Sequence, residues 1–246
     1  MSEKAITPYE PENDDLDAFQ QVSGDDLLLP VRKLVQGSSR VADARHAGEF
    51  FDTMAETYKP SLRIAILALR KSRALFAAGS FDQPPLCVSD DAIIPRGRVE
   101  IGDTFTLTGP TCPTCPFSAW GSDPNGGQGH ACKLSYNLLG YDLDDPAPFV
   151  LRVSGTSIRA WRQYLTSRKL KHVPAYAIET LIHAVPQVFD RGKAYVLTFA
   201  AGEKLSPEEC AAMRREAAAM QDVQIRLEAQ EDAAEESGED DETPFE

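Results

Sequence analysis

The chain lacks an apolar run long enough to cross a membrane. Its longest aliphatic stretch, residues 64–69, has six residues, whereas a spanning helix needs about 20. The N-terminal Met1-Ser-Glu-Lys is not followed by an apolar signal region, which argues against export. The five cysteines are odd in number and unevenly spaced, unlike a secreted disulfide framework. We therefore expect a cytoplasmic protein with reduced thiols and no membrane association.

Several enzyme signatures are also missing. The sequence has no H-E-x-x-H, no Walker loop and no G-x-S-x-G. Nucleobase deaminases combine H-x-E with P-C-x-x-C, but His46-Ala-Gly-Glu49 is one residue too long and Thr111, not proline, precedes Cys112. The sequence therefore favours a protein that is not an enzyme.

Charge is unevenly distributed along the 246 residues. Residues 228–246 hold ten acids and no Lys or Arg, and residues 1–17 hold six acids and one lysine. The two ends account for −10 and −5 of the net charge of −13, which leaves the body slightly basic at +2. A basic body is compatible with a nucleic-acid partner despite the acidic total.

Hydrophobic periodicity and turn signals predict a mainly β (α+β) protein. Apolar spacing predicts an amphipathic helix over 41–58. Residues 156–169 fit a short helix, with Thr156 or Ser157 as its cap. Ser206-Pro207-Glu208-Glu209 combines a capping box with proline at the first helical position and opens a helix to about residue 227. β-Branched and aromatic runs predict strands, which we place at 27–35, 61–69, 74–77, 84–88, 99–107, 132–143, 149–153, 176–189 and 194–200.

This pattern suits a small, partly open β-barrel of the OB kind, a fold that commonly binds single strands. A purely structural antiparallel α+β domain fits the pattern almost as well. We divide the chain into a disordered acidic N-terminus (1–26), an OB-like domain (27–205) with a zinc-binding insertion (about 87–132), a C-terminal helix (206–227) and a disordered acidic tail (228–246).

The cysteines suggest a structural zinc site. Cys112-Pro-Thr-Cys115 is a C-x2-C knuckle, whose tight turn lets two thiolates reach one metal. Cys132 follows 17 positions after Cys115. The first choice for the ligand set is Cys87, Cys112, Cys115 and Cys132, and the second replaces Cys87 with His130. The intervening loop has few large apolar side chains, so a metal would supply stability that burial cannot. Free cysteines lining a loop remain the alternative.

Basic and aromatic side chains alternate in two stretches without acids, residues 58–81 and 146–178. Cations neutralise phosphates, and aromatic faces stack bases without regard to sequence. Aromatics in strands are more often core, and arginines on helices are more often solvated. The candidate nucleic-acid-binding residues are Lys59, Arg63, Arg70, Lys71, Arg73, Trp120, Arg152, Arg159, Trp161, Arg162, Tyr164, Arg168, Lys169 and Lys171.

The acidic tail closes with an apolar pair, Pro244-Phe245, which follows Asp240 and Asp241. This tip resembles that of bacterial single-stranded DNA-binding proteins and of phage replication proteins of like function, which end in an acidic tail finished by an aromatic. In those bacterial proteins the aromatic is the last residue, whereas Glu246 follows Phe245 here. The resemblance implies that Asp240, Asp241, Pro244 and Phe245 recruit replication or recombination proteins.

A second resemblance covers the middle of the chain. The stretch from Cys87 through Cys112-Pro-Thr-Cys115-Pro, Cys132 and Pro148 to Tyr164 is similar to uncharacterised phage-encoded proteins, which we place in replication or recombination. The two resemblances together imply a phage single-stranded DNA-binding protein, located in the host cytoplasm and compatible with a homo-oligomer. The cysteine cluster is foreign to ordinary bacterial members.

Two other classes of function stay open from the residues alone. A metal-dependent nuclease would need clustered carboxylates, for which the candidates are Asp90, Asp91, Asp142, Asp144 and Asp145. A zinc-bearing adaptor or inhibitor would use the acidic ends to mimic nucleic acid and would bind none itself.

Overall fold

A computed structural model of the chain describes residues 29–37, 42–77, 85–96, 100–101, 105–106, 111–123, 129–189 and 192–220. The predicted acidic ends, 1–26 and 228–246, lie outside these residues. Neither α-helix of the described part is long and apolar enough to span a bilayer.

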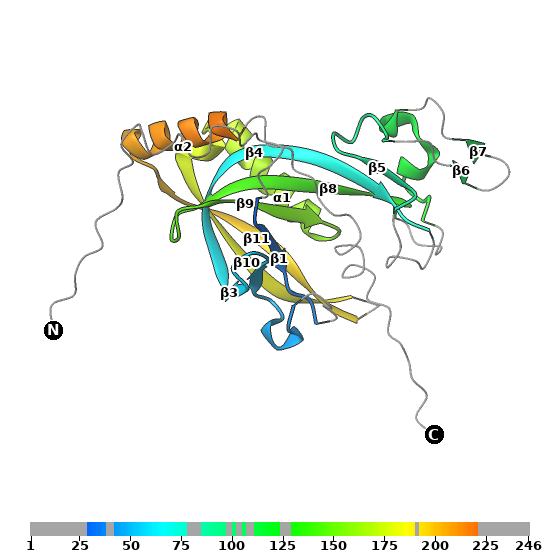
Figure 1. Cartoon of the computed structure of the whole chain (residues 1–246), viewed down its shortest axis with the longest axis horizontal. Coiled ribbons are helices and arrows are strands. Elements are labelled where there is room, and N and C mark those ends of the chain that lie inside the picture. The colour runs from blue at the N-terminus through cyan, green and yellow to red at the C-terminus, as the bar shows by residue number, and fades with distance from the viewer. Residues whose placement is uncertain are drawn as a thin grey trace, which may run out of the picture.

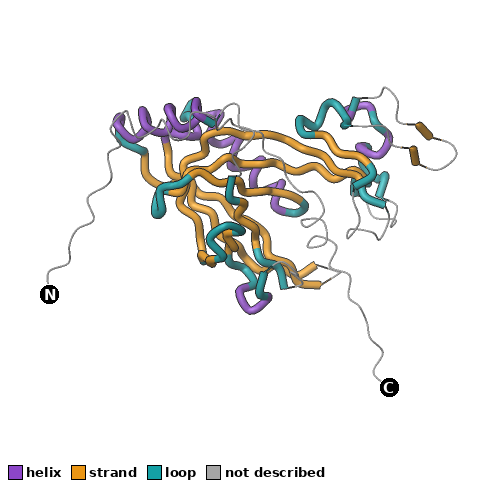
Figure 2. Tube along the Cα trace, in the orientation of Figure 1, coloured by secondary structure: helices purple, strands orange, loops and turns teal. Residues whose placement is uncertain are grey.

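The described residues form a mainly β structure with two α-helices (Figures 1 and 2). The strands are β1 (Val31–Leu34), β2 (Phe50–Asp52), β3 (Thr57–Lys59), β4 (Ser61–Leu75), β5 (Cys87–Ser89), β6 (Glu100–Ile101), β7 (Phe105–Thr106), β8 (Cys132–Asp142), β9 (Pro148–Ser154), β10 (Ile178–Phe189) and β11 (Gly192–Lys204). The helices are α1 (Ser157–Leu170) and α2 (Pro207–Ala219), and short 3₁₀ turns include η4 (Cys112–Thr114) and η5 (Pro116–Ser118).

One large sheet contains nine of these strands. Its order is β11-β10-β4-β8-β9-β1-β2-β3, and β5 pairs separately with β4. Neighbours are antiparallel except β1 and β9, which run parallel. Figure 1 shows β4 and β8 curving across the molecule from α2 at one end to β5 at the other, so the sheet is a curled, open half-barrel. The predicted mainly β class is confirmed at this level.

The hydrophobic core lies where the sheet curls around α1. Strand β4 supplies Leu62, Ile64 and Ile66, which alternate along the chain as expected for one face of a strand. Gly140 of β8 permits close packing at this level, because a Cβ at that position would lie 2.9 Å from the ring of Phe149. Burial of this apolar surface is the main stabilising contribution to the fold.

The order of hairpins and helices matches much of the sequence prediction. The β8–β9 hairpin, helix α1 and the long β10–β11 hairpin all form at their expected places. Helix α2 begins with the predicted capping box, because Ser206 and Glu209 each accept the other's backbone N–H through their side chains. The predicted extension of this helix to residue 227 passes beyond the described residues, which end at 220.

Three local predictions are wrong. One strand was expected over 99–107, but β6 and β7 lie in this range and pair antiparallel with each other. Residues 41–58 were expected to form one helix, but the described part contains a single 3₁₀ turn followed by β2 and β3. Gly48 explains the break, because its φ of +94° is left-handed. The two strands predicted between 61 and 77 are one continuous strand, β4, with a bulge between Ile66 and Ala68 where the apolar alternation shifts.

Candidate functional site

The face of β4 that supplies the core becomes basic beyond the bulge. Leu69 pairs with Leu138, and Lys71 pairs with Tyr136, so both pairs lie on the same face of the sheet. Along this face the apolar row of the core is therefore continued by Lys71 and then by Arg73. The bulge sets this register, because without it Lys71 would point to the opposite face.

Tyr136 lies at the boundary between the core and the basic row. Its ring lies 5.7 Å from the Lys71 ammonium and 5.8 Å from the Arg162 guanidinium, in cation–π contact with both. The Arg162 Nε also donates to the Tyr136 hydroxyl at 3.1 Å. This contact places a cation of α1 beside a cation of β4, although the two residues are far apart in sequence.

A cleft of about 580 Å³ opens beside this row. It is lined by Arg70 and Lys71 of β4 and by residues of the segment after β5, namely Asp90, Asp91, Ile94 and Arg96. This segment folds back onto β5, because Arg96 forms an isolated antiparallel β-bridge with Val88 of that strand. Three of the six lining residues are cations and one is apolar, so the cleft offers both phosphate contacts and a hydrophobic surface.

The two carboxylates of the cleft already have local partners. Asp90 pairs with Arg96 at 2.8 Å. Asp91 accepts the backbone N–H of Ile94 and of Ile93, and these hydrogen bonds hold the pKa of Asp91 below its usual value. Asp91 therefore shapes the turn that carries Ile94, and remains ionised at neutral pH.

Other predicted cations are held in ion pairs away from the cleft. Lys59 contacts the Asp142 carboxylate at 2.6 Å. Arg63 contacts Asp144 at 2.8 Å and Glu179 at 2.6 Å. These pairs join β3 and β4 to the β8–β9 connection and to β10. Lys59 and Arg63 thus have carboxylate partners, as Arg96 has in Asp90, and their predicted role as phosphate contacts stays a prediction.

The remaining predicted cations divide between the sheet and α1. Arg152 of β9 donates to the Ser135 hydroxyl at 3.0 Å, and Arg168 lies over the Tyr164 ring at 5.4 Å. The exposed members are Arg159, Arg162, Lys169 and Lys171, all on α1 or at its C-terminal end. Of these, the structure brings Arg162 next to Lys71 and the basic row.

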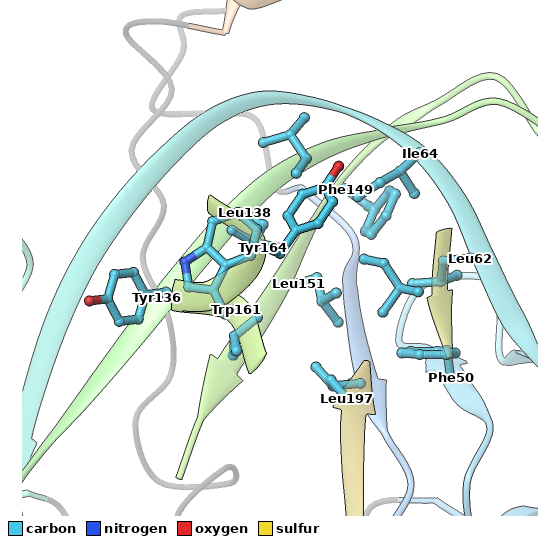
Figure 3. Close-up of a cluster of buried hydrophobic side chains, with 13 residues drawn as sticks. Phe50, Leu62, Ile64, Tyr136, Leu138, Phe149, Leu151, Trp161, Tyr164 and Leu197 are labelled. Carbon is cyan, nitrogen blue, oxygen red and sulfur yellow. The ribbon is translucent and has the colours of Figure 1, made fainter. Parts of the chain in front are cut away.

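Two predicted stacking residues belong to the core instead. Trp161 is 1% exposed and Tyr164 is 7% exposed. Figure 3 shows both rings under the arch of β4 with Leu138 and Leu151. Helical spacing places them on the buried face of α1, so the prediction that they stack on bases is corrected: in this structure their faces pack against the sheet.

Trp120 has the opposite environment. It follows η5 and is 70% exposed, touching the His130 ring edge-on at 5.2 Å between centroids. An exposed aromatic of this size in a loop presents a flat apolar surface to solvent. Trp120 is thus the predicted stacking residue whose ring is accessible.

Four cysteines line a second, much smaller pocket of about 20 Å³. Cys87, Cys112, Cys115 and Cys132 surround it, together with Leu75, Pro95, Phe117 and Ser118. Sheet register explains part of this arrangement: Leu75 of β4 pairs with Cys87 on one side and with Cys132 on the other. The fifth cysteine, Cys210, lies on α2, where its thiol contacts the Leu205 carbonyl.

Cys112 and Cys132 of this pocket are buried, and Cys87 and Cys115 are half-buried. Burial raises the pKa of Cys132 to about 12, partly opposed by the nearby Arg73 guanidinium. Burial also raises the pKa of Cys87, with smaller contributions from Cys112 and Cys115. All five cysteines are free thiols. The raised pKa values keep the Cys87 and Cys132 thiols protonated at neutral pH unless a cation displaces their protons.

The described residues contain no group of three or more His, Cys, Asp or Glu side chains in place to hold a metal ion. The predicted nuclease carboxylates therefore form no such group among the described residues. Asp142 is 1% exposed and contacts both Arg32 and Lys59, and its second oxygen accepts the backbone N–H of Asp144 and of Asp145. Asp142 is therefore engaged in a structural network.

Sequence reasoning missed three residues of this region. Arg96 lies outside the two acid-free stretches, so composition did not select it. Tyr136 is an aromatic residue within the predicted strand 132–143, where a core position is the usual interpretation. Ser118 lines the cysteine pocket with a buried hydroxyl that has no hydrogen-bond partner among the described residues. The one available signal was the closeness of Ser118 to the C-x2-C knuckle.

Comparisons with protein-family models, with curated proteins and with solved structures found no match to this chain. Its function is therefore inferred from the residues and their arrangement alone.

Proposed function

We propose that this chain binds single-stranded nucleic acid without sequence specificity, through the basic cleft beside β4. The observation that carries the proposal is the meeting of Arg70, Lys71 and Arg96 around one cleft of about 580 Å³. Arg162 extends the cationic surface from α1, beside Tyr136. The phosphate backbone supplies most of non-specific affinity, and it is contacted by cations of this kind.

Base stacking is the second component of the proposal. Ile94 is 65% exposed at the cleft, and Trp120 is 70% exposed. Single strands expose the faces of their bases, and an accessible aromatic stacks on them whatever the sequence. A duplex offers phosphates but few base faces, so the combination favours single strands. The curled, open half-barrel is compatible with an OB-like fold, in which a sheet face and its loops hold the strand.

The acidic tail has a proposed role in recruitment. Residues 228–246 would bind replication or recombination proteins through Asp240, Asp241, Pro244 and Phe245, and its acids would compete with nucleic acid for the cleft. In this proposal the protein acts in phage DNA replication or recombination. Removing 228–246 tightens binding at low salt and has less effect at high salt, where screening weakens the competition.

The test is fluorescence anisotropy of a labelled oligo-dT over a salt series, with single- and double-stranded competitors. The Arg70→Gln/Lys71→Gln variant removes two cations and lowers the salt slope by about 1.4, at roughly 0.7 per phosphate contact for single strands. Lys193→Gln is the matched control, because Lys193 is exposed on the β10–β11 hairpin. Absence of single-strand binding at low salt, with and without the tail, would refute the proposal.

A further inference from the structure

We propose that Cys87, Cys112, Cys115 and Cys132 bind one structural Zn²⁺ ion, which holds the wall of the basic cleft. The four residues come from β5, from η4, from the junction between η4 and η5, and from the start of β8, yet they line the same small pocket. Four thiolates are the donor set of closed, structural zinc sites. This inference does not depend on nucleic-acid binding and is tested without it.

The position of each cysteine follows from hydrogen bonding. Leu75 of β4 lies between Cys87 and Cys132 in the sheet register, so the three residues share one face. The Cys112 N–H donates to the Ile93 carbonyl at 2.8 Å, and the Cys115 N–H to the Cys112 carbonyl at 3.3 Å. These backbone hydrogen bonds place Cys112 and Cys115 at the pocket that Cys87 and Cys132 also line.

The pocket has room for one ion and little else. Its volume of about 20 Å³ compares with roughly 10–15 Å³ for one water-sized sphere. The sulfurs are not yet in place around a metal, so binding draws them together to the Zn–S distance of about 2.3 Å. In this proposal the segment that moves is η4 with Cys115 after it, because β5 and β8 are held by pairing with β4.

Neighbouring polar groups suit a charged thiolate cluster. Binding converts four thiols and Zn²⁺ into a tetrathiolate complex of charge −2 and releases four protons to solvent. The Arg73 guanidinium contacts the Cys132 carbonyl at 3.1 Å and offsets part of that charge. The buried Ser118 hydroxyl, which has no partner in the described part of the chain, can donate to a thiolate sulfur.

His130 is less suited to be the fourth ligand than Cys87. The His130 ring lies edge-on to the Trp120 ring, and its Nδ1 contacts the Ser118 carbonyl at 2.8 Å. Cys87 lines the pocket, whereas His130 does not. Of the two ligand sets considered from the sequence, the geometry therefore favours the all-cysteine set.

Zinc would fix the position of the cleft wall. The segment with Asp90, Asp91, Ile94 and Arg96 runs from Cys87 toward Cys112, and Ile93 within it accepts the Cys112 N–H. A metal joined to both ends of this segment restricts it to one position relative to β4. The role is therefore that of a clamp on one side of the cleft.

The experiment uses the full chain, produced with zinc in the medium and kept reduced. Elemental analysis should find about one zinc per chain, and a mercurial thiol reagent should release it as about four thiols react. Replacement with Co²⁺ should give the intense near-ultraviolet thiolate-to-metal absorption of an all-sulfur site. Cys112→Ser and Cys115→Ser should each lower bound zinc at least tenfold.

Two control variants identify the ligands. Cys210→Ser, in the cysteine of α2, and His130→Ala should both retain full zinc, whereas Cys87→Ser should lose it. Wild-type protein that takes up no zinc, and whose reduced chain gives no thiolate absorption with Co²⁺, overturns the site. Loss of zinc in His130→Ala together with retention in Cys87→Ser overturns the ligand assignment. Because the wild-type measurements need no variant, failure of a cysteine variant to fold does not prevent the decision.

Discussion

The Nε of Arg162 donates a hydrogen bond to the hydroxyl of Tyr136 at 3.1 Å. This contact connects α1 to strand β8, which pairs with β4. Lys71 lies over the same ring. Tyr136 therefore holds two cations, from a helix and a strand, at one level of the sheet. In the proposed function this spacing sets where two phosphates of a bound strand can lie.

Tyr136→Phe tests this arrangement. The variant keeps the ring and its cation–π contacts but removes the hydroxyl, so the free energy of unfolding should fall by only about 0.5–1.5 kcal/mol. Oligo-dT affinity should fall less than in Arg162→Gln, which removes the cation itself. A double-mutant cycle with Arg162→Gln, read by urea unfolding and by anisotropy, isolates the coupling between the two side chains. Fully additive effects in both measurements would contradict the positioning role.

Trp161→Ala tests whether this tryptophan is core. Because its side chain is 1% exposed within the main cluster, the variant should lose about 3–5 kcal/mol of stability in urea unfolding. Arg159→Ala is the control from the same helix: its side chain is exposed, and the expected change is within about 0.5 kcal/mol. A stable Trp161→Ala with weakened oligo-dT binding would restore the stacking role predicted from sequence.

Trp120→Ala should give the reverse pattern. The ring is 70% exposed, so the unfolding free energy should change little, while oligo-dT affinity should weaken by about 1–3 kcal/mol if the ring stacks on a base. Tryptophan fluorescence quenching on addition of oligo-dT gives a second readout, with Trp161 buried as the internal reference. Unchanged affinity and no quenching would remove Trp120 from the proposed site.

Asp142→Asn should destabilise the fold by about 3 kcal/mol, because the partly buried Lys59 loses its partner and the buried Arg32 keeps only Asp52. Asp145→Asn is the matched control, since Asp145 is 77% exposed and 4.0 Å from Lys59; its effect should stay within about 0.5 kcal/mol. Equal effects of the two variants in urea unfolding at pH 7 would contradict the buried network.

The pH dependence of Asp142 has a definite sign. Burial tends to raise its pKa, but hydrogen bonds from Lys59 and Arg32 outweigh burial and hold the pKa below its usual value. The stabilisation from the ionised carboxylate is therefore present above the unfolded-state pKa of about 3.9 and is lost as pH falls through the lower folded value. Wild type should lose stability below about pH 4, and Asp142→Asn should lack this component.

Local sequence signals predicted the elements that depend on short-range interactions. The capping box at Ser206, the β8–β9 and β10–β11 hairpins and the amphipathic α1 each rest on residues a few positions apart, and each forms as expected. The helix expected over 41–58 failed because its apolar spacing also fits two short strands, which are stabilised by pairing with β1 and with each other. Propensity cannot detect such distant pairing.

The sequence alone determined the acidic ends, the chemical types of the candidate ligands and the stretches in which cations and aromatics alternate. Tertiary structure decided which of those side chains share a surface. The bulge in β4 placed Lys71 beside Tyr136, helix packing buried Trp161, and pairing of β4 with both β5 and β8 brought Cys87 and Cys132 to one pocket. The physical reason is that burial and strand register depend on contacts between residues far apart in the chain, which no local pattern records.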